Sequence, residues 1–367
     1  MSLQEEIDKR ASQIYRESYP MSIGELMNLY RDGELDIHPE FQRVFRWSPF
    51  QKTKLIESIM LNIPIPPIFV SQSSDGVWDV IDGVQRLSTI FQFVGLCKDE
   101  NDKLLDPLVL DKTDYLPSFE GMMWKNETDE DLSFTREQQL SFKRSRIDII
   151  IMKKESDPIA KYELFQRLNT GGTKLSEQEV RNCLMIMTNK SFYEFVMHLS
   201  EIEQFKNCLP ISDRRTDEQY RTELLLRMLI PNYIHWDEIA QYADFAQLLD
   251  KETLKICDQK LDYSQIEQDF ISTFTLLSEV FGEDAFKKYN GSKHLGPVMA
   301  SAFQSIATGV YVNITSIMDQ PQRNDWLKER VQSLYSEEVF IKNTIPGVKA
   351  IPRFKELSEF GVEFFKP

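Results

Sequence analysis

The chain has 367 residues, of which 41% are hydrophobic and 28% charged, which is typical of a folded globular protein with two or three domains. The net charge of −15 argues against duplex binding through a uniformly basic face, so any contact with nucleic acid would need a local basic cluster. Because no run of about 18 apolar residues and no leader-type segment occurs, we expect a cytoplasmic protein without a membrane partner.

Two short helices are predicted in the N-terminal part, each opened by a capping box. The S-x-x-E pattern at residues 22–25 begins the first helix, and the S-P-x-Q pattern at 48–51 begins a second helix over about 49–61. Between them, Leu35 to His38 is expected to be extended. The proline-rich residues 63–67 cannot continue the second helix, because successive prolines remove donors and favour extended backbone.

A strand pair and a helix follow. Residues 68–71 and 77–81 predict two strands around a Ser-Ser-Asp-Gly turn, and 84–94 returns to helical spacing. Asp82 and Gly83 are therefore expected at a strand-to-helix junction. Residues 98–139 are polar and acidic and are expected to form an insertion or long loop rather than core.

Residues 146–151 predict a further strand, and Asp157-Pro158 opens a helix as far as about residue 168. Beyond Ser176, which starts another capping box, the pattern is helical throughout. The predicted helices there begin at 176 and otherwise cover 217–230, 262–280, 297–318 and 324–337. We expect an α+β chain, with a mixed α/β domain over residues 1–155 and an all-α domain over 156–367.

The segment Asp82-Gly83-Val84-Gln85-Arg86 is the strongest candidate site. Gly83 permits a tight turn, and the amides at the start of a helix attract anions. The planar guanidinium of Arg86 can bind phosphate oxygens beside those amides, and Asp82 can hold a metal ion, a ribose hydroxyl or a water. A structural alternative is that Asp82 caps the helix and Arg86 forms a surface ion pair.

Two further clusters carry polar groups suited to the same ligand. Gln42, Arg43 and Arg46 stand among aromatic residues that can stack on a base, although the aromatics could instead fill the core while the arginines face water. Asn169 precedes two glycines in a turn that can form an anion-binding nest, or simply link two helices.

Lys143, Arg144 and Arg146 form a basic group that could contact a nucleic-acid backbone, although a solvated face explains it equally well. Several other chemistries lack their motifs. The sequence has no GxxxxGK[ST] loop, no HExxH and no GxSxG, and its four cysteines lie far apart, which predicts reduced thiols.

Four motifs in fixed order identify a resemblance. They are F-Q-R-V-F-R-W at 41–47, the L-I-E-S-I and I-P-I-P-P segments at 55–59 and 63–67, V-I-D-G-V-Q-R-L-S-T at 80–89, and the 165–172 stretch followed by Leu175, Ser176 and Glu179. Over about residues 20 to 185 the chain resembles the N-terminal domain family of GmrSD-type restriction systems.

This resemblance implies a ParB/sulfiredoxin-like fold for the N-terminal domain. It also implies nucleotide binding, often with hydrolysis, in bacterial defence against modified phage DNA. The usual family motif is Asp-Gly-Gln-Gln-Arg, and Val84 replaces its first glutamine here. Many relatives carry a histidine-dependent HNH nuclease domain, but residues beyond about 185 show no such set, so a separate effector protein is an expected partner.

The leading hypothesis is a nucleotide-binding defence protein, with nucleotide hydrolysis left open. In it Asp82, Gln85 and Arg86 are the catalytic set, Gln42, Arg43, Arg46, Gly83 and Asn169 hold the ligand, and the cofactors are a nucleoside triphosphate and Mg²⁺ at Asp82. One alternative is a non-catalytic module that binds nucleic acid or a partner, which the Val84 substitution favours. The third is a metal-dependent DNA nuclease. The sequence does not predict the oligomeric state.

Overall fold

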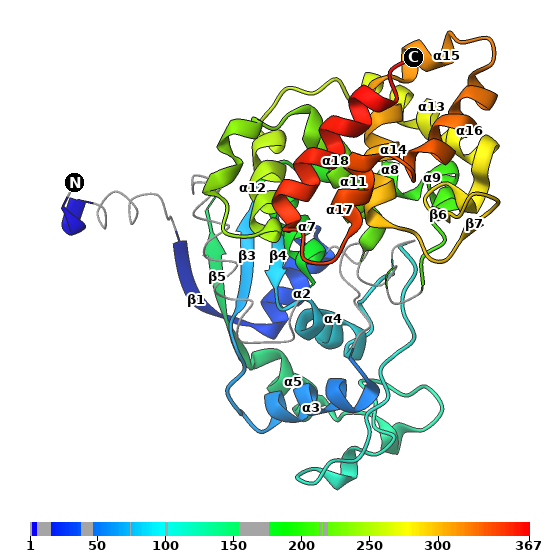
Figure 1. Ribbon diagram of the computed structural model, residues 1–367. Coiled ribbons are helices and arrows are strands. Elements are labelled where there is room, and N and C mark those ends of the chain that lie inside the picture. The colour runs from blue at the N-terminus through cyan, green and yellow to red at the C-terminus, as the bar shows by residue number, and fades with distance from the viewer. Residues whose placement is uncertain are drawn as a thin grey trace. The chain divides into compact units, whose positions relative to one another are not determined.

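The computed structural model describes residues 2–5, 16–37, 47–73, 75–99, 102–153, 176–212, 215 and 219–367. The chain forms two compact units, Met1–Lys174 and Leu175–Pro367 (Figure 1). The first unit is mixed α/β and the second is built mainly of helices, which confirms the predicted fold class. The predicted domain boundary at residues 155 and 156 lies outside the described residues and stays a prediction.

A five-stranded mixed sheet forms the frame of the N-terminal unit, with the order β1-β5-β3-β4-β2. The predicted hairpin is present, because β3 (Ile68–Gln72) pairs antiparallel with β4 (Trp78–Asp82). β5 (Arg146–Met152) lies parallel to β3, and β2 (Leu35–Asp36) lies parallel to β4. The edge strand β1 (Arg16–Ser22), antiparallel to β5, was not predicted.

Side-chain caps start three of the helices in this unit. Ser22 accepts a hydrogen bond from the Glu25 amide at the start of α2 (Ile23–Arg31), and Ser48 forms a full capping box with Gln51 at the start of α3 (Pro49–Met60). Both predictions are confirmed. A third box, at Thr135, starts α5 (Arg136–Arg144), which was not predicted. The predicted helix after β4 is α4 (Val84–Phe93).

The hydrophobic core of the N-terminal unit lies between one face of the sheet and the helices. It also includes residues from the irregular segment 98–139, where the expectation of a loop outside the core is wrong. Leu108, Leu110, Phe119 and Phe134 of this segment are buried in that core. The ring of Phe134 contacts Phe93 of α4 edge-on at 4.9 Å between centroids. Scattered apolar residues without periodicity gave no signal for this packing.

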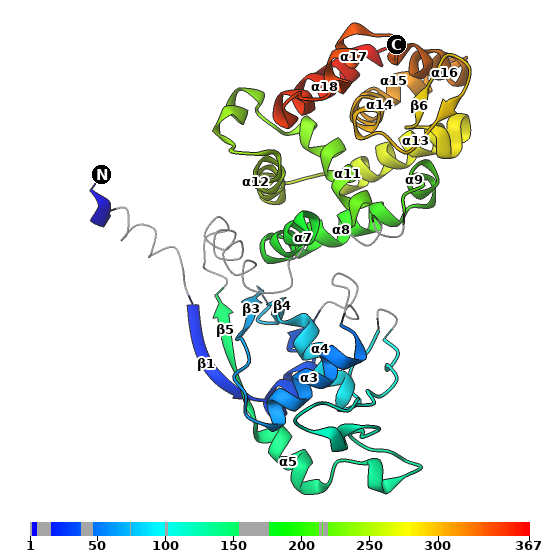
Figure 2. The same ribbon diagram turned by 60° about the horizontal axis from the view of Figure 1, so that its bottom comes forward.

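Helices make up most of the C-terminal unit (Figure 2). The segment predicted as one helix over 297–318 is two helices that meet at Asn313, and the two-residue strands β6 (Lys288–Tyr289) and β7 (His294–Leu295) form a small hairpin. The α-helices are α7 (Glu177–Thr188), α8 (Lys190–Glu201), α9 (Glu203–Cys208), α11 (Tyr220–Leu229), α12 (Phe245–Cys257), α13 (Tyr263–Phe281), α14 (Ala300–Val312), α15 (Ile314–Met318), α16 (Arg323–Leu334), α17 (Glu338–Thr344) and α18 (Ala350–Phe364).

All four cysteine thiols are free and buried. Burial raises the pKa of Cys97 and of Cys208 to about 12, so both thiols are protonated and unreactive at neutral pH. Within the described ranges, the longest apolar helices fall short of what spanning a membrane requires.

Candidate functional site

The turn between β4 and α4 is built around a glycine. Asp82 is the last residue of β4, and Gly83 is the N-cap of α4 with φ 106° and ψ 10°, in the left-handed region that side chains disfavour. A Cβ atom at this position would also clash with the Cδ1 atom of Ile68. Glycine is therefore favoured by the backbone conformation, and any larger residue would also force the Ile68 side chain to shift.

Because glycine has no side chain, the N-terminus of α4 has no side-chain cap. The amides of Arg86 and Leu87 donate to the carbonyl of Gly83, so regular helical bonding begins only there. Amides earlier in the first turn of a helix have no intrahelical acceptor and carry partial positive charge. This end of α4 therefore carries partial positive charge, and the predicted binding of an anion there stays a prediction.

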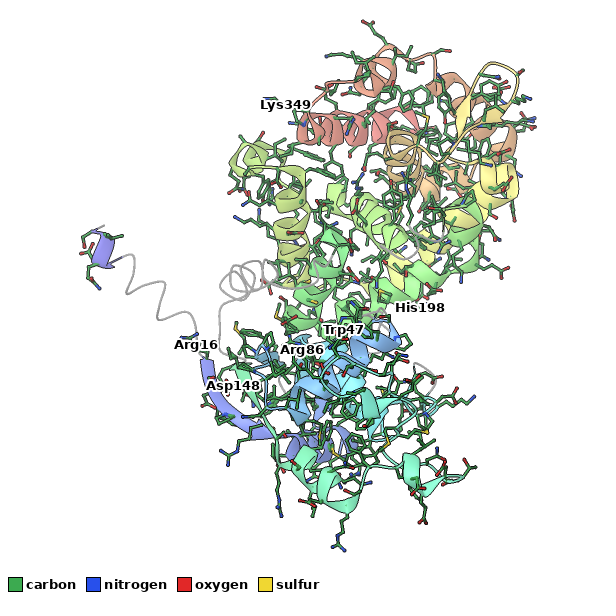
Figure 3. All side chains as sticks on the ribbon, turned by 90° about the horizontal axis from the view of Figure 1, so that it is seen from below. Arg16, Trp47, Arg86, Asp148, His198 and Lys349 are labelled. Carbon is green, nitrogen blue, oxygen red and sulfur yellow. The ribbon has the colours of Figure 1, made fainter. Side chains whose placement is uncertain are left out.

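The side chain of Arg86 is labelled in Figure 3, and three acceptors fix its guanidinium. Its Nη2 atom donates to Asp82 Oδ2 at 2.6 Å, while Nη1 donates to the carbonyls of Pro66 and Pro67, the latter at 3.1 Å. The Arg86 side chain is only 11% exposed, whereas that of Asp82 is 49% exposed. Burial lowers the pKa of the guanidinium below its usual value, and the neighbouring carboxylate opposes that change.

The positions of Asp82 and Arg86 can be compared with the structural alternative, in which Asp82 caps the helix and Arg86 forms a surface ion pair. Asp82 precedes the N-cap rather than being the N-cap, and Arg86 makes an ion pair in which its own side chain is largely buried while that of Asp82 is half-exposed. The Arg86 guanidinium has five N–H donors, of which three are used by the described acceptors. Two of those acceptors are the backbone carbonyls of Pro66 and Pro67, which cannot move without a change in the backbone. The Asp82 carboxylate is a side-chain group, so it can rotate away from Arg86 while the backbone stays in place.

Val84 and Gln85 differ in their surroundings. Val84 is 1% exposed and belongs to the hydrophobic core, so the position where the family motif has its first glutamine faces the core in this chain. Gln85 is partly buried, and its carbonyl accepts hydrogen bonds from Ser88 at 3.2 Å and Thr89 at 2.6 Å. The Val84 substitution thus removes an amide from a packed position.

The structure brings together four of the predicted site residues, Asp82, Gly83, Gln85 and Arg86. Four others, Gln42, Arg43, Arg46 and Asn169, lie outside the described residues, and their roles stay predictions. Trp47, the aromatic residue that ends the 41–47 motif, is partly buried and packs against the core.

The basic group of the first unit is at the surface. Lys143 and Arg144 end α5 and Arg146 begins β5, and all three are exposed. The Lys143 ammonium lies 5.7 Å from the ring centroid of Trp124. Arg144 lines an open groove of about 720 Å³ together with Arg136, which sequence reasoning missed.

The described residues offer few ligands for a metal ion. In the part of the chain that the structure describes, there is no group of three or more His, Cys, Asp or Glu side chains that could hold one. Asp82 can still contribute one carboxylate oxygen. Because Mg²⁺ is often held by one or two carboxylates together with substrate phosphates, this donor set fits an ion that arrives with a nucleotide.

Sequence reasoning also missed a buried arginine in α7. Arg181 is fully buried, and its guanidinium binds Glu223 of α11 at 2.8 Å, Asp250 of α12 at 3.1 Å and Gln178 of its own helix at 2.8 Å. The partners come from helices 42 and 69 residues later, so nothing local in the sequence indicates them. This network joins three helices of the C-terminal unit.

The fold defines a protein with an α/β unit, in which an uncapped helix N-terminus follows a strand, and with a helical unit after it. Residues 23–186 match the family model described as "GmrSD restriction endonuclease, N-terminal domain". This match confirms the family predicted from the motifs for that segment, and it points to a protein of a restriction-like defence system. No curated protein and no solved structure matches the chain, so the ParB/sulfiredoxin likeness stays a prediction.

Proposed function

We propose that the β4–α4 junction binds the phosphates of a nucleoside triphosphate, and that this binding serves a restriction-like defence function. The observation that carries the proposal is the Asp82–Arg86 ion pair at a helix N-terminus without a side-chain cap. The pair places a fixed cation and a half-exposed carboxylate at the same end of α4. A phosphate group would pair with the Arg86 cation and the helix N-terminus, and the cation that accompanies the phosphate would pair with the Asp82 carboxylate.

Binding would proceed by exchange of partners. Arg86 keeps its bonds to the carbonyls of Pro66 and Pro67, which hold the guanidinium in place, and releases Asp82 so that Nη2 can donate to a phosphate oxygen instead. Arg86 and Asp82 then both keep a partner of opposite charge. Leaving either charge unpaired at this partly buried position would cost free energy. The released Asp82 can hold the Mg²⁺ ion, which would neutralise phosphate charge.

Hydrolysis would use the same residues for positioning. Phosphoryl transfer depends mainly on alignment and on neutralising charge, so a small set of residues suffices. Gln85, in the first turn of α4, would orient the attacking water. Arg43 and Asn169 would complete the phosphate contacts, as expected from the sequence.

Titration calorimetry of the full chain with ATP, GTP and CTP tests the proposal. We expect Mg²⁺-dependent binding that Arg86→Lys weakens about tenfold or more, because the bidentate geometry is lost. Arg136→Lys, an exposed position, is the matched control. Asp82→Asn should raise affinity for the metal-free nucleotide and remove the Mg²⁺ dependence. The absence of binding by the parent chain, or equal binding by Arg86→Lys, would overturn the assignment.

The exposed basic group supports a second candidate, a module that binds nucleic acid without catalysis. Lys143, Arg144 and Arg146 would contact the phosphate backbone against the acidic background of the chain. Replacing all three by glutamine should weaken DNA binding and lower the slope of log K against log salt by about 2 to 3. Multiple-turnover phosphate release with and without DNA separates the two candidates, with Asp82→Ala as control. Magnesium-dependent cutting of plasmid DNA would instead favour a nuclease.

A further inference from the structure

Helices α14 and α18 of the C-terminal unit pack side by side in the same direction (Figures 1 and 2). The Ser305 hydroxyl donates to the carbonyl of Leu357 at 3.1 Å, and the Asn313 amide donates to that of Val362 at 2.8 Å, so contacts advance together along both helices. Gly309 faces Gly361 closely enough that a Cβ on either would clash with backbone of the other helix. Both N-termini therefore lie at the same end of the pair.

A cavity of about 320 Å³ opens at that shared end. Its lining includes the first residues of both helices, Ala300 and Ser301 of α14 and Ala350 of α18. Neither helix start has a side-chain cap within the described part of the chain. Parallel helix dipoles repel each other, and both positive ends point to this cavity, so an anion placed there would stabilise the pair.

Gln304 supplies a buried polar group that independently indicates a ligand. The residue is 3% exposed and lines the cavity. Its Nε2 atom is surrounded by acceptors, the carbonyl of Arg227 at 3.0 Å and the hydroxyls of Thr308 and Ser358 at 3.1 and 2.9 Å. Its Oε1 atom has no hydrogen-bond partner among the residues that the structure describes. Such a buried acceptor is costly unless a donor reaches it.

Two arginines complete the lining. Arg227 is held by Glu223 at 2.6 Å, and its guanidinium lies 4.7 Å from the ring centroid of Phe245. Arg353, near the start of α18, makes no ion pair with any described residue and is partly exposed. The carboxylate of Glu356 close by is engaged by the Asn343 amide at 2.9 Å. Arg353 is therefore the cation available to a ligand.

We propose that this cavity is a second ligand site, which binds a phosphorylated small molecule of mononucleotide size. The phosphate would lie between the two helix N-termini and Arg353, because its oxygens can accept from all three. The Gln304 side chain would turn towards the cavity so that its buried Oε1 atom accepts from an N–H group of the ligand. A volume at the small end of the range for ligand pockets fits one nucleotide rather than a polymer. This site is independent of the β4–α4 junction.

Titration of the full chain with inorganic phosphate and with the four nucleoside monophosphates, without Mg²⁺, tests the site. We expect a nucleoside monophosphate to bind more tightly than phosphate, and Arg353→Gln to weaken it about tenfold. Lys355→Gln removes the same charge from the same helix at a residue that does not line the cavity, and should change affinity less than about twofold. Equal losses in the two variants, or no binding by the parent, would overturn the proposal.

A substitution in α14 separates a loss of ligand binding from a loss of folding. Ser301→Asp places a carboxylate in the first turn of α14, where its negative charge stabilises the N-terminus of the helix. The carboxylate also occupies the part of the cavity in which we place the phosphate. We expect binding to be lost while the Tm stays equal or rises. Retained binding in this variant would count against the site. Ser301 lies outside the β4–α4 junction, so Ser301→Asp should leave Mg²⁺-dependent triphosphate binding at that junction unchanged, and failure there and failure here are distinguishable.

Discussion

The Nη2 atom of Arg86 lies 2.6 Å from Oδ2 of Asp82, across the turn where β4 becomes α4. The same guanidinium binds the carbonyls of Pro66 and Pro67, which precede β3. Arg86 thus ties the proline-rich segment to the start of α4, and it also supplies the cation that we propose for phosphate binding. Its structural and functional contributions must be separated by experiment.

Arg86→Ala should lower the free energy of unfolding of the N-terminal unit by about 1.5 to 3 kcal/mol, because the proline carbonyls lose a charged donor. Asp82→Asn should cost less than about 1 kcal/mol, since that carboxylate is 49% exposed. Hydrogen exchange of β4 and α4 under native conditions measures both. Equal costs would show that the proline carbonyls contribute little to holding Arg86.

Gly83→Ala should destabilise the β4–α4 turn more than Gly95→Ala does. Both glycines have positive φ, 106° and 74°, so alanine is strained at either position. Only at Gly83 would the added Cβ also meet the Ile68 side chain, whereas at Gly95 it would meet nothing within 4 Å. We expect about 1 to 2 kcal/mol at Gly95 and a larger loss at Gly83. Urea unfolding of the two variants compares them.

Local signals predicted the helix starts and the hairpin correctly. N-cap serines at Ser22, Ser48 and Ser176 each begin a helix, the last two as full capping boxes, because the hydrogen bonds involved join residues three apart. The Asp82-Gly83 junction was predicted for the same reason. Helix starts and tight turns of this kind are determined by residues that are close together in the sequence.

Contacts between distant residues could not be predicted. The core positions of Leu108 and Phe134 depend on packing against α4 and carry no periodicity. The cavity beside Gln304 depends on two parallel helices that a long segment separates in the sequence. Arg86 was expected to be open to ligand, but its two carbonyl partners come from a proline-rich stretch about 20 residues earlier.

The stability of the N-terminal unit should fall as the pH drops, through Glu57 of α3. Its carboxylate is buried, and although burial alone would raise its pKa, hydrogen bonds from Lys54 at 2.8 Å and from the Thr113 hydroxyl lower it below 4.5. Because the folded-state pKa is lowered, the stabilisation is present above pH 4.5 and is lost as the pH falls through the folded-state value.

Glu57→Gln should therefore cost about 1.5 to 3 kcal/mol at pH 7 and progressively less toward pH 3. Urea unfolding across that range measures the difference from the parent. Glu127→Gln is the control, because that carboxylate is 85% exposed and should show no such trend. A pH-independent cost at Glu57 would mean that packing, and not the ionised carboxylate, stabilises this part of the fold.

Arg181 is the residue whose loss should most affect the C-terminal unit. Its fully buried guanidinium binds both Glu223 and Asp250, so Arg181→Leu removes the positive charge that these buried carboxylates share. We expect a loss of about 3 to 5 kcal/mol, measured by urea unfolding and by hydrogen exchange in α11 and α12. Lys328→Leu, at an exposed position of α16, should cost little.

A triple variant distinguishes a structural from a functional reason for this buried charge. Replacing Arg181, Glu223 and Asp250 together by leucine removes the charges along with the need to pair them, and such replacements are often neutral or stabilising. If stability returns while nucleotide or monophosphate binding is lost, the network positions residues such as Arg227, which shares Glu223 and lines the cavity. If the triple variant recovers its stability and also binds nucleotide and monophosphate like the parent, the network only joins α7 to its neighbours, and the cavity does not depend on it.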